Sequence, residues 1–471
     1  MMAAIWREFP ALGGGLGALN KGLDRVAGRR DAWGRLRHYN FAMQKGRERR
    51  VTVRWMCVWL AILAAGCAAA GWGGATVHAS AAAAARGGQA AAGDAGELTA
   101  DESRAIVEAA WQDVHDKFYD PKFRGVDWDA VHAQYVQRAA AVHDRNQAEA
   151  LVREMIGLLH NSHSGVMTHA ELDWMKNELP FFFERVNGRT FVSHVLATHG
   201  DATDVGVRFG DEIVTVDGQP AAALRMIAVR WLMPVLSDPY YGAAGSTATV
   251  GLRRDGRALT VKVKRVRRDA VEPVFAEQYG PVGYVRLLSL TAATVPPEAL
   301  RQAMDKVDGS KGIILDLRDC VGGDAPDADG LGGMLLGAGV KLATGVTRAG
   351  TETVENTVDF GPVYKGRVVV LVNGQTASEP EMLTAALKEY GRVTVVGTRT
   401  RGAFNGFTEG MGLPDGAGIL VVPIDRGVSP QGKEYEGVGV TPDVTVENSI
   451  RDFRAGRDRA METALRLAAV R

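Results

Sequence analysis

Cysteine is scarce in this chain, with three residues among 471. Cys57 and Cys67 lie in one apolar segment near the N-terminus, and Cys320 is the only cysteine beyond that segment. An intramolecular disulfide is therefore excluded from the body of the protein, which must be stabilised by its hydrophobic core. The hydrophobic content of 46% and the charged content of 23% are ordinary for a globular protein of two or three domains.

The sequence patterns of cofactor sites are also absent. No histidine, cysteine or acidic residues have the spacing of metal ligands, and no glycine-rich loop has the pattern that binds a nucleotide. No internal repeat is visible. We therefore expect neither a metal nor a cofactor.

The net charge of zero hides a split along the chain. Residues 1–54 hold 12 Lys and Arg against 4 Asp and Glu, whereas the remainder holds 43 against 51. An acidic body gives no reason to expect nucleic-acid binding. The basic N-terminus has another meaning, because an apolar run follows it directly.

That apolar run covers residues 55–71, and the pattern predicts an export signal or a membrane anchor. Leu63-Ala-Ala-Gly-Cys67 resembles a lipoprotein cleavage box with its leucine one place early, so Cys67 is a candidate for lipidation. Ala79-Ser-Ala81 is the competing, ordinary cleavage site. A start at Met43 would give the signal a compact basic region. We expect an exported protein of the periplasm or cell envelope, soluble or tethered through Cys67 or residues 55–71.

Residues 1–98 thus comprise a basic N-terminus, a signal or anchor, and an Ala- and Gly-rich linker. Thr99 and Glu102 form a capping box before apolar residues at spacings of three and four, which predicts a helix. Two more helices are expected over 128–142 and 146–159, completing a helical module over 99–177 that carries Ser162-His163. A β-rich domain follows over 178–268, with a tight turn at Asp217-Gly218.

Residues 272–450 alternate between strand and helix patterns, which predicts an α/β layer architecture. Their continuous apolar runs suit strands that are covered on both faces. The expected strands cover 282–287, 312–317, 367–372, 393–396 and 419–424, and the expected helices cover 297–306, 328–336 and 379–390. A C-terminal helix is expected over 451–471.

Ser378 is the most informative residue, in the run Thr376-Ala-Ser-Glu-Pro-Glu381 between a strand and a helix. A serine at such a turn exposes its hydroxyl at the positive end of the helix, where an oxyanion is also stabilised. The same run fits a capping box, with Ser378 as the cap and Glu381 reaching back. A histidine in Ser162-His163 and a carboxylate at Glu436 could complete a catalytic set, which favours a serine hydrolase.

The order of these motifs resembles the C-terminal processing peptidases and the related tricorn-core peptidases. The likeness covers residues 100–450 and rests on Ser162-His163, a PDZ-like segment, Asp316-Leu-Arg-Asp-Cys-Val-Gly-Gly323, Thr376-Ala-Ser378 and Glu436-Gly-Val-Gly-Val-Thr-Pro-Asp443. One branch of that superfamily activates its serine with a lysine 25 residues downstream, where this chain has Ala403. The lysine mechanism is therefore excluded, and the Ser-His pair with a late glutamate matches the tricorn-like branch. The resemblance implies a crotonase-like ββα-spiral core over 272–450 and a PDZ-like domain over 178–268.

The resemblance also implies a role for each candidate residue. Ser378 would be the nucleophile and His163 the base, with Ser162 relaying His163 to Glu436. The backbone N–H of Gly322 or Gly323, together with that of Glu379, would form the oxyanion hole. The competing interpretations are a helix-terminal role for His163 and an exposed loop position for Glu436, whose neighbour Glu434 is also acidic. Asp316 and Arg318 are expected to form a structural ion pair.

These patterns together predict a serine endopeptidase that cleaves unfolded or C-terminal peptide segments. The PDZ-like domain would hold a polypeptide substrate by its C-terminus. The alternative is a catalytically silent protein on the same fold that binds peptides or an apolar ligand. The oligomeric state is not indicated by any pattern in the chain.

Overall fold

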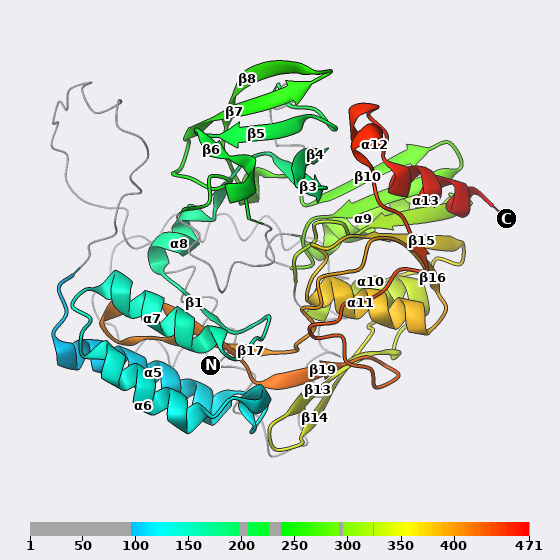
Figure 1. The fold of residues 1–471 in the computed structure, drawn as a ribbon. Coiled ribbons are helices and arrows are strands. Elements are labelled where there is room, and N and C mark those ends of the chain that lie inside the picture. Colours follow the sequence, from blue (N-terminus) through cyan, green and yellow to red (C-terminus); the bar gives the residue numbers. More distant parts are fainter. Residues whose placement is uncertain (1–95, 197–205, 226–236, 292–294, 324, 471) are drawn as a thin grey trace, which may run out of the picture. The chain divides into compact units, whose positions relative to one another are not determined.

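The computed structural model describes residues 96–196, 206–225, 237–291, 295–323 and 325–470, all within one unit, Gly88–Arg471. An N-terminal helical module opens the described part (Figure 1), with α5 (Ala100–Lys117), η1 (Phe123–Gly125), α6 (Trp128–Ala139) and α7 (Arg145–Gly157). The predicted capping box is confirmed, because Thr99 Oγ1 accepts from the Glu102 N–H at 3.2 Å and Glu102 Oε2 accepts from the Thr99 N–H at 2.7 Å. Leu98 was assigned to the linker, but its side chain is buried in this module and its N–H donates to the His143 carbonyl.

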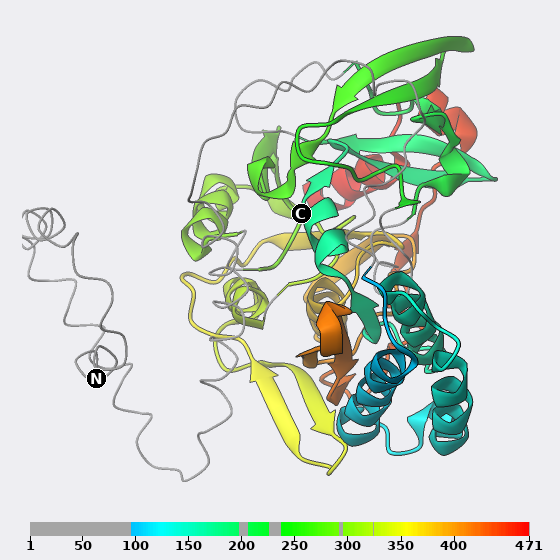
Figure 2. The same ribbon diagram turned by 90° about the vertical axis from the view of Figure 1, so that its left-hand side faces the viewer.

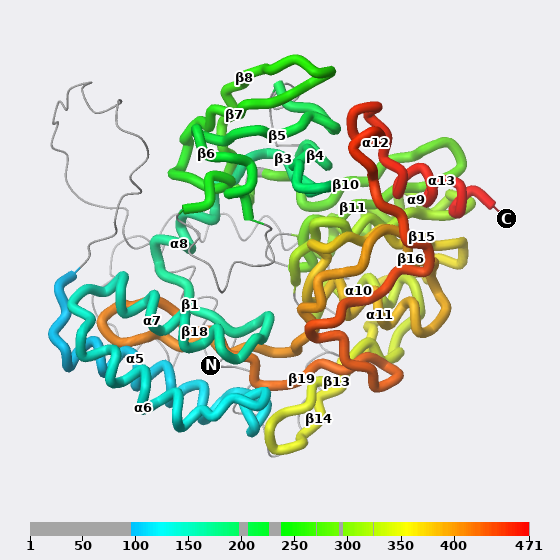
Figure 3. Tube along the Cα trace, viewed as in Figure 1, coloured from blue at the N-terminus to red at the C-terminus, as the bar shows by residue number. Residues whose placement is uncertain are grey.

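The helical module is attached to the C-terminal half of the chain by a shared sheet. Its short strand β1 (Gly165–Met167) pairs antiparallel with β18 (Ile419–Pro423), which pairs in turn with β17 (Thr408–Gly412). Leu420 and Val422 of β18 lie in the same buried cluster as the apolar faces of α5, α6 and α7. Figures 2 and 3 show this orange segment beside the cyan helices. Residues just before β1 are thereby held against the core.

An antiparallel sheet follows the helical module, as the β-rich pattern predicted. Its strand order is β3-β4-β5-β7-β8, and the short strand β6 pairs with β5. Asp217 and Gly218 both have positive φ, 49° and 79°, as the two-residue turn of a β5–β6 hairpin requires. The elements of this region are α8 (His169–Trp174), β2 (Asn177–Glu178), β3 (Phe181–Val186), β4 (Arg189–Val195), β5 (Glu212–Val216), β6 (Gln219–Pro220), η2 (Ala221–Ala223), β7 (Thr247–Arg254), β8 (Arg257–Lys264), β9 (Val266–Arg267) and η5 (Arg268–Ala270).

The core is a six-stranded sheet in the order β10-β11-β12-β15-β16-β20. Only β10 runs antiparallel to its neighbour, and the other pairs are parallel. The strands are β10 (Val274–Tyr279), β11 (Val282–Leu287), β12 (Gly312–Asp316), β15 (Arg367–Val372), β16 (Val393–Gly397) and β20 (Val444–Thr445). The strand predictions for this sheet are confirmed, with bounds that differ by at most one residue.

Helices cover both faces of the core sheet, which explains its continuous apolar runs. Ile313 and Leu315 of β12 pack in one cluster with α9 (Pro297–Val307), α10 (Ala325–Leu336) and α11 (Glu379–Glu389). Ile314 lies on the opposite face, in a cluster with the alanines of α13 (Arg459–Ala469). Figure 1 shows α10 and α11 on one side of the strands and α13 on the other.

A second three-stranded sheet flanks α11 and was not predicted. It has the order β14-β13-β19 and is built from β13 (Lys341–Thr347), β14 (Glu352–Asn356) and β19 (Asp425–Val428). A 3₁₀ turn, η6 (Pro414–Gly416), joins β17 to β18. The single C-terminal helix expected over 451–471 is wrong, because the segment forms α12 (Ile450–Arg454) and then α13. Gly456 has a φ of +64° just after α12, a left-handed conformation that ends a helix.

The export signal, Cys67 and most of the linker lie outside the described residues. Within the described ranges, no helix is both long and apolar enough to cross a membrane.

Candidate active site

Ser378 lies at the junction of β15 and α11, directly before the first helical residue. Its backbone has φ 62° and ψ −129°, a strained conformation for a residue other than glycine. A sharp strand-to-helix turn of this kind exposes a serine hydroxyl, and the helix N-terminus adds a positive potential beside it. The local backbone therefore suits a nucleophile.

Two residues from the helical module, Ser162 and His163, connect Ser378 to Glu436. His163 Nε2 lies 3.2 Å from Ser378 Oγ, across 215 residues of chain. Ser162 Oγ lies 2.7 Å from His163 Nδ1 and donates to Glu436 Oε2 at 2.8 Å. The four side chains named from the sequence thus form one continuous chain of contacts, in the order Ser378, His163, Ser162, Glu436.

The hydrogen bonds fix the tautomer of His163. The single hydroxyl proton of Ser162 is directed at Glu436, so Ser162 Oγ can only accept from His163 Nδ1–H. The other ring nitrogen, Nε2, is then unprotonated and faces the Ser378 hydroxyl. Burial lowers the pKa of His163 below its usual value, and the charge of Glu436 opposes this effect. A neutral imidazole that faces a serine hydroxyl is placed to accept its proton.

Backbone bonds hold the Ser162-His163 turn in place. The Ser162 N–H donates to Glu436 Oε1 at 2.9 Å, and the His163 N–H donates to Asn161 Oδ1 at 2.9 Å. Glu436 also accepts from the Phe404 N–H at 2.8 Å. The neighbouring Glu434 is exposed and pairs with Arg426, so it takes no part in this arrangement. Asn161 and Phe404 were not named from the sequence, because nothing in their local pattern indicates these contacts.

Gly322 and Gly323 follow β12, and each requires glycine for a different reason. Gly322 has a φ of +153°, and a Cβ there would meet only the Ser378 Cβ, at 3.7 Å. A Cβ on Gly323 would lie 2.0 Å from the Leu290 carbonyl oxygen, which rules out any side chain without rearrangement. The glycine pair therefore brings bare backbone close to Ser378, as an oxyanion hole requires.

Glu381 anchors the loop that follows β16. Its buried carboxyl accepts from Thr400 Oγ1 at 2.5 Å, from the Gly402 N–H at 2.7 Å, from the Ala403 N–H at 2.8 Å and from the Ser378 N–H at 3.2 Å. Burial raises the pKa of Glu381 to about 7, although these hydrogen bonds oppose the rise. Ala403 occupies the position of the missing lysine, and its carbonyl accepts from the Ser378 N–H at 2.8 Å. This loop therefore supports the Ser378 backbone.

Glu379 is buried, and its carboxyl lies against Glu355 of β14. Burial first, and then the charge of Glu379, raise the pKa of Glu355 to about 9. The raised pKa favours the protonated form of Glu355, which can donate to Glu379. The predicted structural role of Asp316 is also seen, since Arg318 Nη2 donates to Asp316 Oδ2 at 2.7 Å. Among the residues that the structure describes, no group of three or more His, Cys, Asp or Glu side chains is arranged to hold a metal ion.

Two family models match the chain across these elements. The model of peptidase family S41 matches residues 281–446, and the model of the tricorn protease C1 domain matches residues 99–157. This chain carries a peptidase family S41 domain. The S41 domain contains Gly322, Gly323, Ser378 and Glu436, whereas Ser162-His163 lies just beyond the end of the C1 match.

Two similar proteins, both processing peptidases, support the S41 assignment. The chloroplastic C-terminal processing peptidase of Tetradesmus obliquus is 27% identical over 367 residues, which covers 72% of this chain and 76% of that protein. The carboxy-terminal-processing protease of Bartonella bacilliformis is 30% identical over 266 residues, which covers 55% of this chain and 58% of that protein. The S41 domain and these relatives make the chain a serine-type peptidase, a hydrolase.

Solved structures show the same fold. The photosystem II D1 C-terminal processing protease has a TM-score of 0.54 at 23% identity, and the match covers 78% of this chain and 97% of that chain. Mature CPAF complexed with lactacystin has a TM-score of 0.57 at 16% identity, and the match covers 79% of this chain and 98% of that chain. The mixed α/β architecture is therefore that of S41 proteases.

Proposed function

We propose that the protein is a serine endopeptidase that cleaves unfolded or C-terminal peptide segments with a Ser378-His163-Ser162-Glu436 tetrad. The observation that carries the proposal is the unbroken chain of contacts from Ser378 Oγ to the Glu436 carboxylate, at 3.2, 2.7 and 2.8 Å. The neutral His163 ring and its free Nε2 give that chain a direction for proton transfer. The S41 domain and its processing-protease relatives support the same reaction class.

In the proposed reaction, Ser378 Oγ attacks the peptide carbonyl carbon while its proton passes to His163 Nε2. The resulting imidazolium keeps its Nδ1–H on Ser162 Oγ, and the Glu436 charge stabilises it through Ser162. His163 then returns the proton to the leaving amine, and an acyl-enzyme remains on Ser378. Water, activated by His163, hydrolyses the ester and restores the serine.

The oxyanion would be stabilised by the backbone N–H of Glu379, which lies in the first turn of α11, and by one glycine N–H. The glycine donor would be the N–H of Gly322 or of Gly323, the pair that follows β12.

The decisive experiment is covalent labelling with a fluorophosphonate probe, combined with digestion of unfolded casein. Labelling should disappear in Ser378→Ala, and both Ser378→Ala and His163→Ala should lose about 10⁴-fold or more in turnover. Ser103→Ala is a matched control, because it removes a buried hydroxyl that bonds only the Val142 carbonyl in the helical module. Casein turnover that persists in Ser378→Ala would refute the tetrad. An unlabelled wild-type protein that still binds peptides would favour the alternative, a silent binding protein on this fold.

We further propose that the core has the crotonase-like ββα spiral and that the β3–β8 sheet is a PDZ-like domain that holds a polypeptide C-terminus. Both end strands of that sheet, β3 and β8, pair on one side only among the described residues, so either could accept an extended peptide. A peptide with a free C-terminal carboxylate should compete with casein cleavage better than its amidated form. Equal competition by the two forms would refute capture of the carboxylate.

Export is proposed from the sequence of residues 47–81 alone. If Cys67 is lipidated, Cys67→Ser should abolish palmitate labelling and leave the precursor unprocessed or release the body from the membrane. If cleavage follows Ala81, Cys67→Ser should change neither processing nor solubility. Full-length protein found in the cytosol with residues 1–42 attached would contradict both versions.

A further inference from the structure

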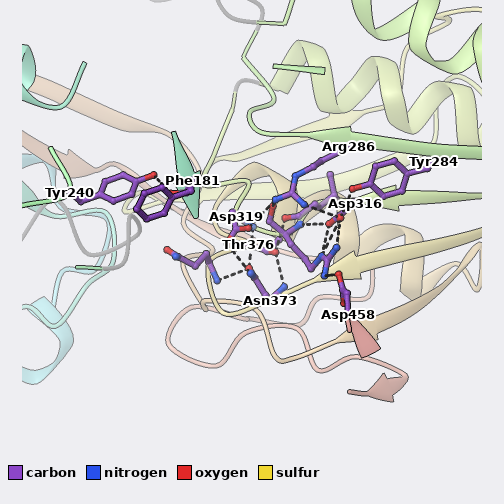
Figure 4. A network of polar contacts seen from close by, with 12 residues as sticks. Phe181, Tyr240, Tyr284, Arg286, Asp316, Asp319, Asn373, Thr376 and Asp458 are labelled. Carbon is purple, nitrogen blue, oxygen red and sulfur yellow. Dashed lines mark hydrogen bonds and ion pairs between the residues drawn. The ribbon is translucent and has the colours of Figure 1, made fainter. Parts of the chain in front are cut away.

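We propose that Asp319 and Asn373 are positioning residues that set the distance between the oxyanion-hole glycines and Ser378. The inference rests on the proposed function, because it assigns a purpose to a contact between the two loops of that site. The oxyanion loop is defined as Leu317–Gly323, which follows β12, and the nucleophile loop as Asn373–Ser378, which follows β15. Figure 4 shows Asp319, Asn373 and Thr376 at the junction of these loops.

The two loops leave the same edge of the core sheet. β12 and β15 are neighbouring parallel strands, with Asp316 in register with Leu371. The carboxyl ends of parallel strands lie side by side, but their loops can still diverge. An additional contact is therefore needed to fix one loop against the other.

Asp319 and Asn373 supply that contact as a reciprocal pair. The Asp319 N–H donates to Asn373 Oδ1 at 3.1 Å, and Asn373 Nδ2 donates to Asp319 Oδ1 at 2.9 Å. Asn373 Oδ1 also accepts from the Gln375 N–H at 3.0 Å. The Asn373 amide is therefore hydrogen-bonded both within its own loop and to the oxyanion loop. Asp319 has a φ of 62°, a left-handed conformation at the point where the oxyanion loop turns toward Gly322.

Further bonds extend the contact toward the reacting atoms. Thr376 Oγ1 donates to the Leu317 carbonyl at 2.8 Å, and the Ala377 N–H donates to the Cys320 carbonyl at 3.1 Å. Cys320 lies two residues before Gly322, and Ala377 directly precedes Ser378. The oxyanion loop is thus bonded to the nucleophile loop at Leu317, Asp319 and Cys320. These bonds set the distance between the oxyanion-hole glycines and Ser378.

Arg286 of β11 binds the Asp319 carboxylate through the oxygen that does not face Asn373. Its Nη2 donates to Asp319 Oδ2 at 3.0 Å, and its Nη1 donates to Asp316 Oδ2 at 3.1 Å. Arg286 and Asp319 are 3% and 2% exposed, so the pair is shielded from water and cannot readily rearrange. Figure 4 shows Arg286 between Asp316 and Asp319, with Tyr284 and Asp458 on the far side of Asp316.

The expected effect is kinetic, because oxyanion stabilisation depends on donor geometry. A misplacement of about 1 Å can cost about 10²-fold in rate, and losing one oxyanion donor costs about 10²–10³-fold in kcat. Asn373→Ala removes both bonds of the pair. It should lower kcat per active site by about 10–10²-fold and leave KM within about threefold, because ground-state binding is not involved.

The test measures kcat per active site in Asn373→Ala, with active sites titrated to completion by a fluorophosphonate probe. Affinity for a peptide aldehyde, which forms a tetrahedral adduct with an oxyanion, should fall by the same factor as kcat/KM. Tyr284→Phe is the matched control, because it removes the 2.9 Å bond to Asp316 Oδ2 from the same network without touching either loop. This control should lower stability and leave kcat per titrated site unchanged.

A swap of the two side chains provides the second test. Asn373→Asp places two carboxylates against each other and should lower kcat. Adding Asp319→Asn restores one donor and one acceptor between the two side chains. The kcat of the double variant should therefore be at least tenfold higher than that of Asn373→Asp. Should Asn373→Ala fail to fold, the comparison of the single and double variants decides the question alone.

The proposal is overturned by an unchanged kcat per titrated site in Asn373→Ala, by an equal loss in Tyr284→Phe, or by equal kcat in Asn373→Asp and the swap. None of these outcomes touches the proposed function, which fails instead when the wild-type protein is neither labelled nor active on casein.

Discussion

Glu436 contacts Ser162 through both of its carboxylate oxygens, although 274 residues separate the two in sequence. Oε1 accepts from the Ser162 N–H at 2.9 Å and Oε2 accepts from the Ser162 hydroxyl at 2.8 Å. One carboxylate therefore fixes both the position of the turn and the direction of the hydroxyl proton. The tautomer of His163 follows from that direction.

Removing either relay residue should impair turnover without unfolding the protein. Ser162→Ala and Glu436→Gln should each lower kcat by about 10²-fold or more, because His163 loses the group that orients it and stabilises its charge. The double variant should lose little beyond the worse single variant, since residues that act as a unit are not additive. Glu434→Gln is the control and should leave kcat unchanged. A double variant whose losses multiply would show that Ser162 and Glu436 act separately.

The pH dependence of kcat/KM should report the lowered pKa of His163. The base is active when neutral, so activity should rise with pH with a midpoint below about pH 6.5, the ordinary histidine value. Below that pH the unfolded chain binds a proton that the folded His163 resists, so this group's contribution to stability is lost as pH falls. The measurement is a kcat/KM profile with a peptide substrate. An acid limb with its midpoint above pH 6.5 would contradict the neutral, buried base.

The hydrogen bonds to the buried Glu381 carboxyl should contribute to the stability of the protein as well as support Ser378. Glu381→Gln replaces one acceptor oxygen with an NH₂ group that must face backbone N–H donors, and each unsatisfied buried donor costs about 1–3 kcal/mol. We expect the free energy of unfolding to fall by about 2–4 kcal/mol, measured by urea denaturation at pH 8. At that pH the wild-type carboxyl, with its pKa of about 7, is mostly ionised. Glu462→Gln, at a half-exposed carboxylate that pairs with Arg457, serves as control, and an equal effect there would remove the special role of Glu381.

Local pattern was enough to predict the core strands and the helix after Ser378. β11 and β15 have the predicted bounds. The apolar run of β15 ends at the turn residues Asn373-Gly374, and both faces of the sheet are covered. The β14-β13-β19 sheet was not predicted, since β14 is an exposed strand whose pattern carries little apolar signal. The break at Gly456 could have been predicted, because glycine often ends a helix.

The catalytic set could be named from the sequence only because its motifs occur in a recognisable order. Their contacts depend on the pairing of β1 with β18, which joins segments more than 250 residues apart. The contacts of Phe404 with Glu436 and of Asp319 with Asn373 could not have been predicted, because backbone N–H groups take part in both. Every residue offers such a group, so no sequence pattern distinguishes the ones that matter.

A lysine at position 403 should not replace the histidine base. Ala403 is 5% exposed, and its N–H and carbonyl are bonded to Glu381 and Ser378, so the loop has no evident freedom to place a longer side chain. Burying an ammonium at this position would also carry a desolvation cost, which would destabilise the fold. The variant Ala403→Lys with His163→Ala should therefore be as inactive on casein as His163→Ala alone, and less stable in urea. Turnover that returns with an alkaline midpoint would show that the fold can use a lysine base after all, and that Ala403 rather than the pocket excludes that mechanism.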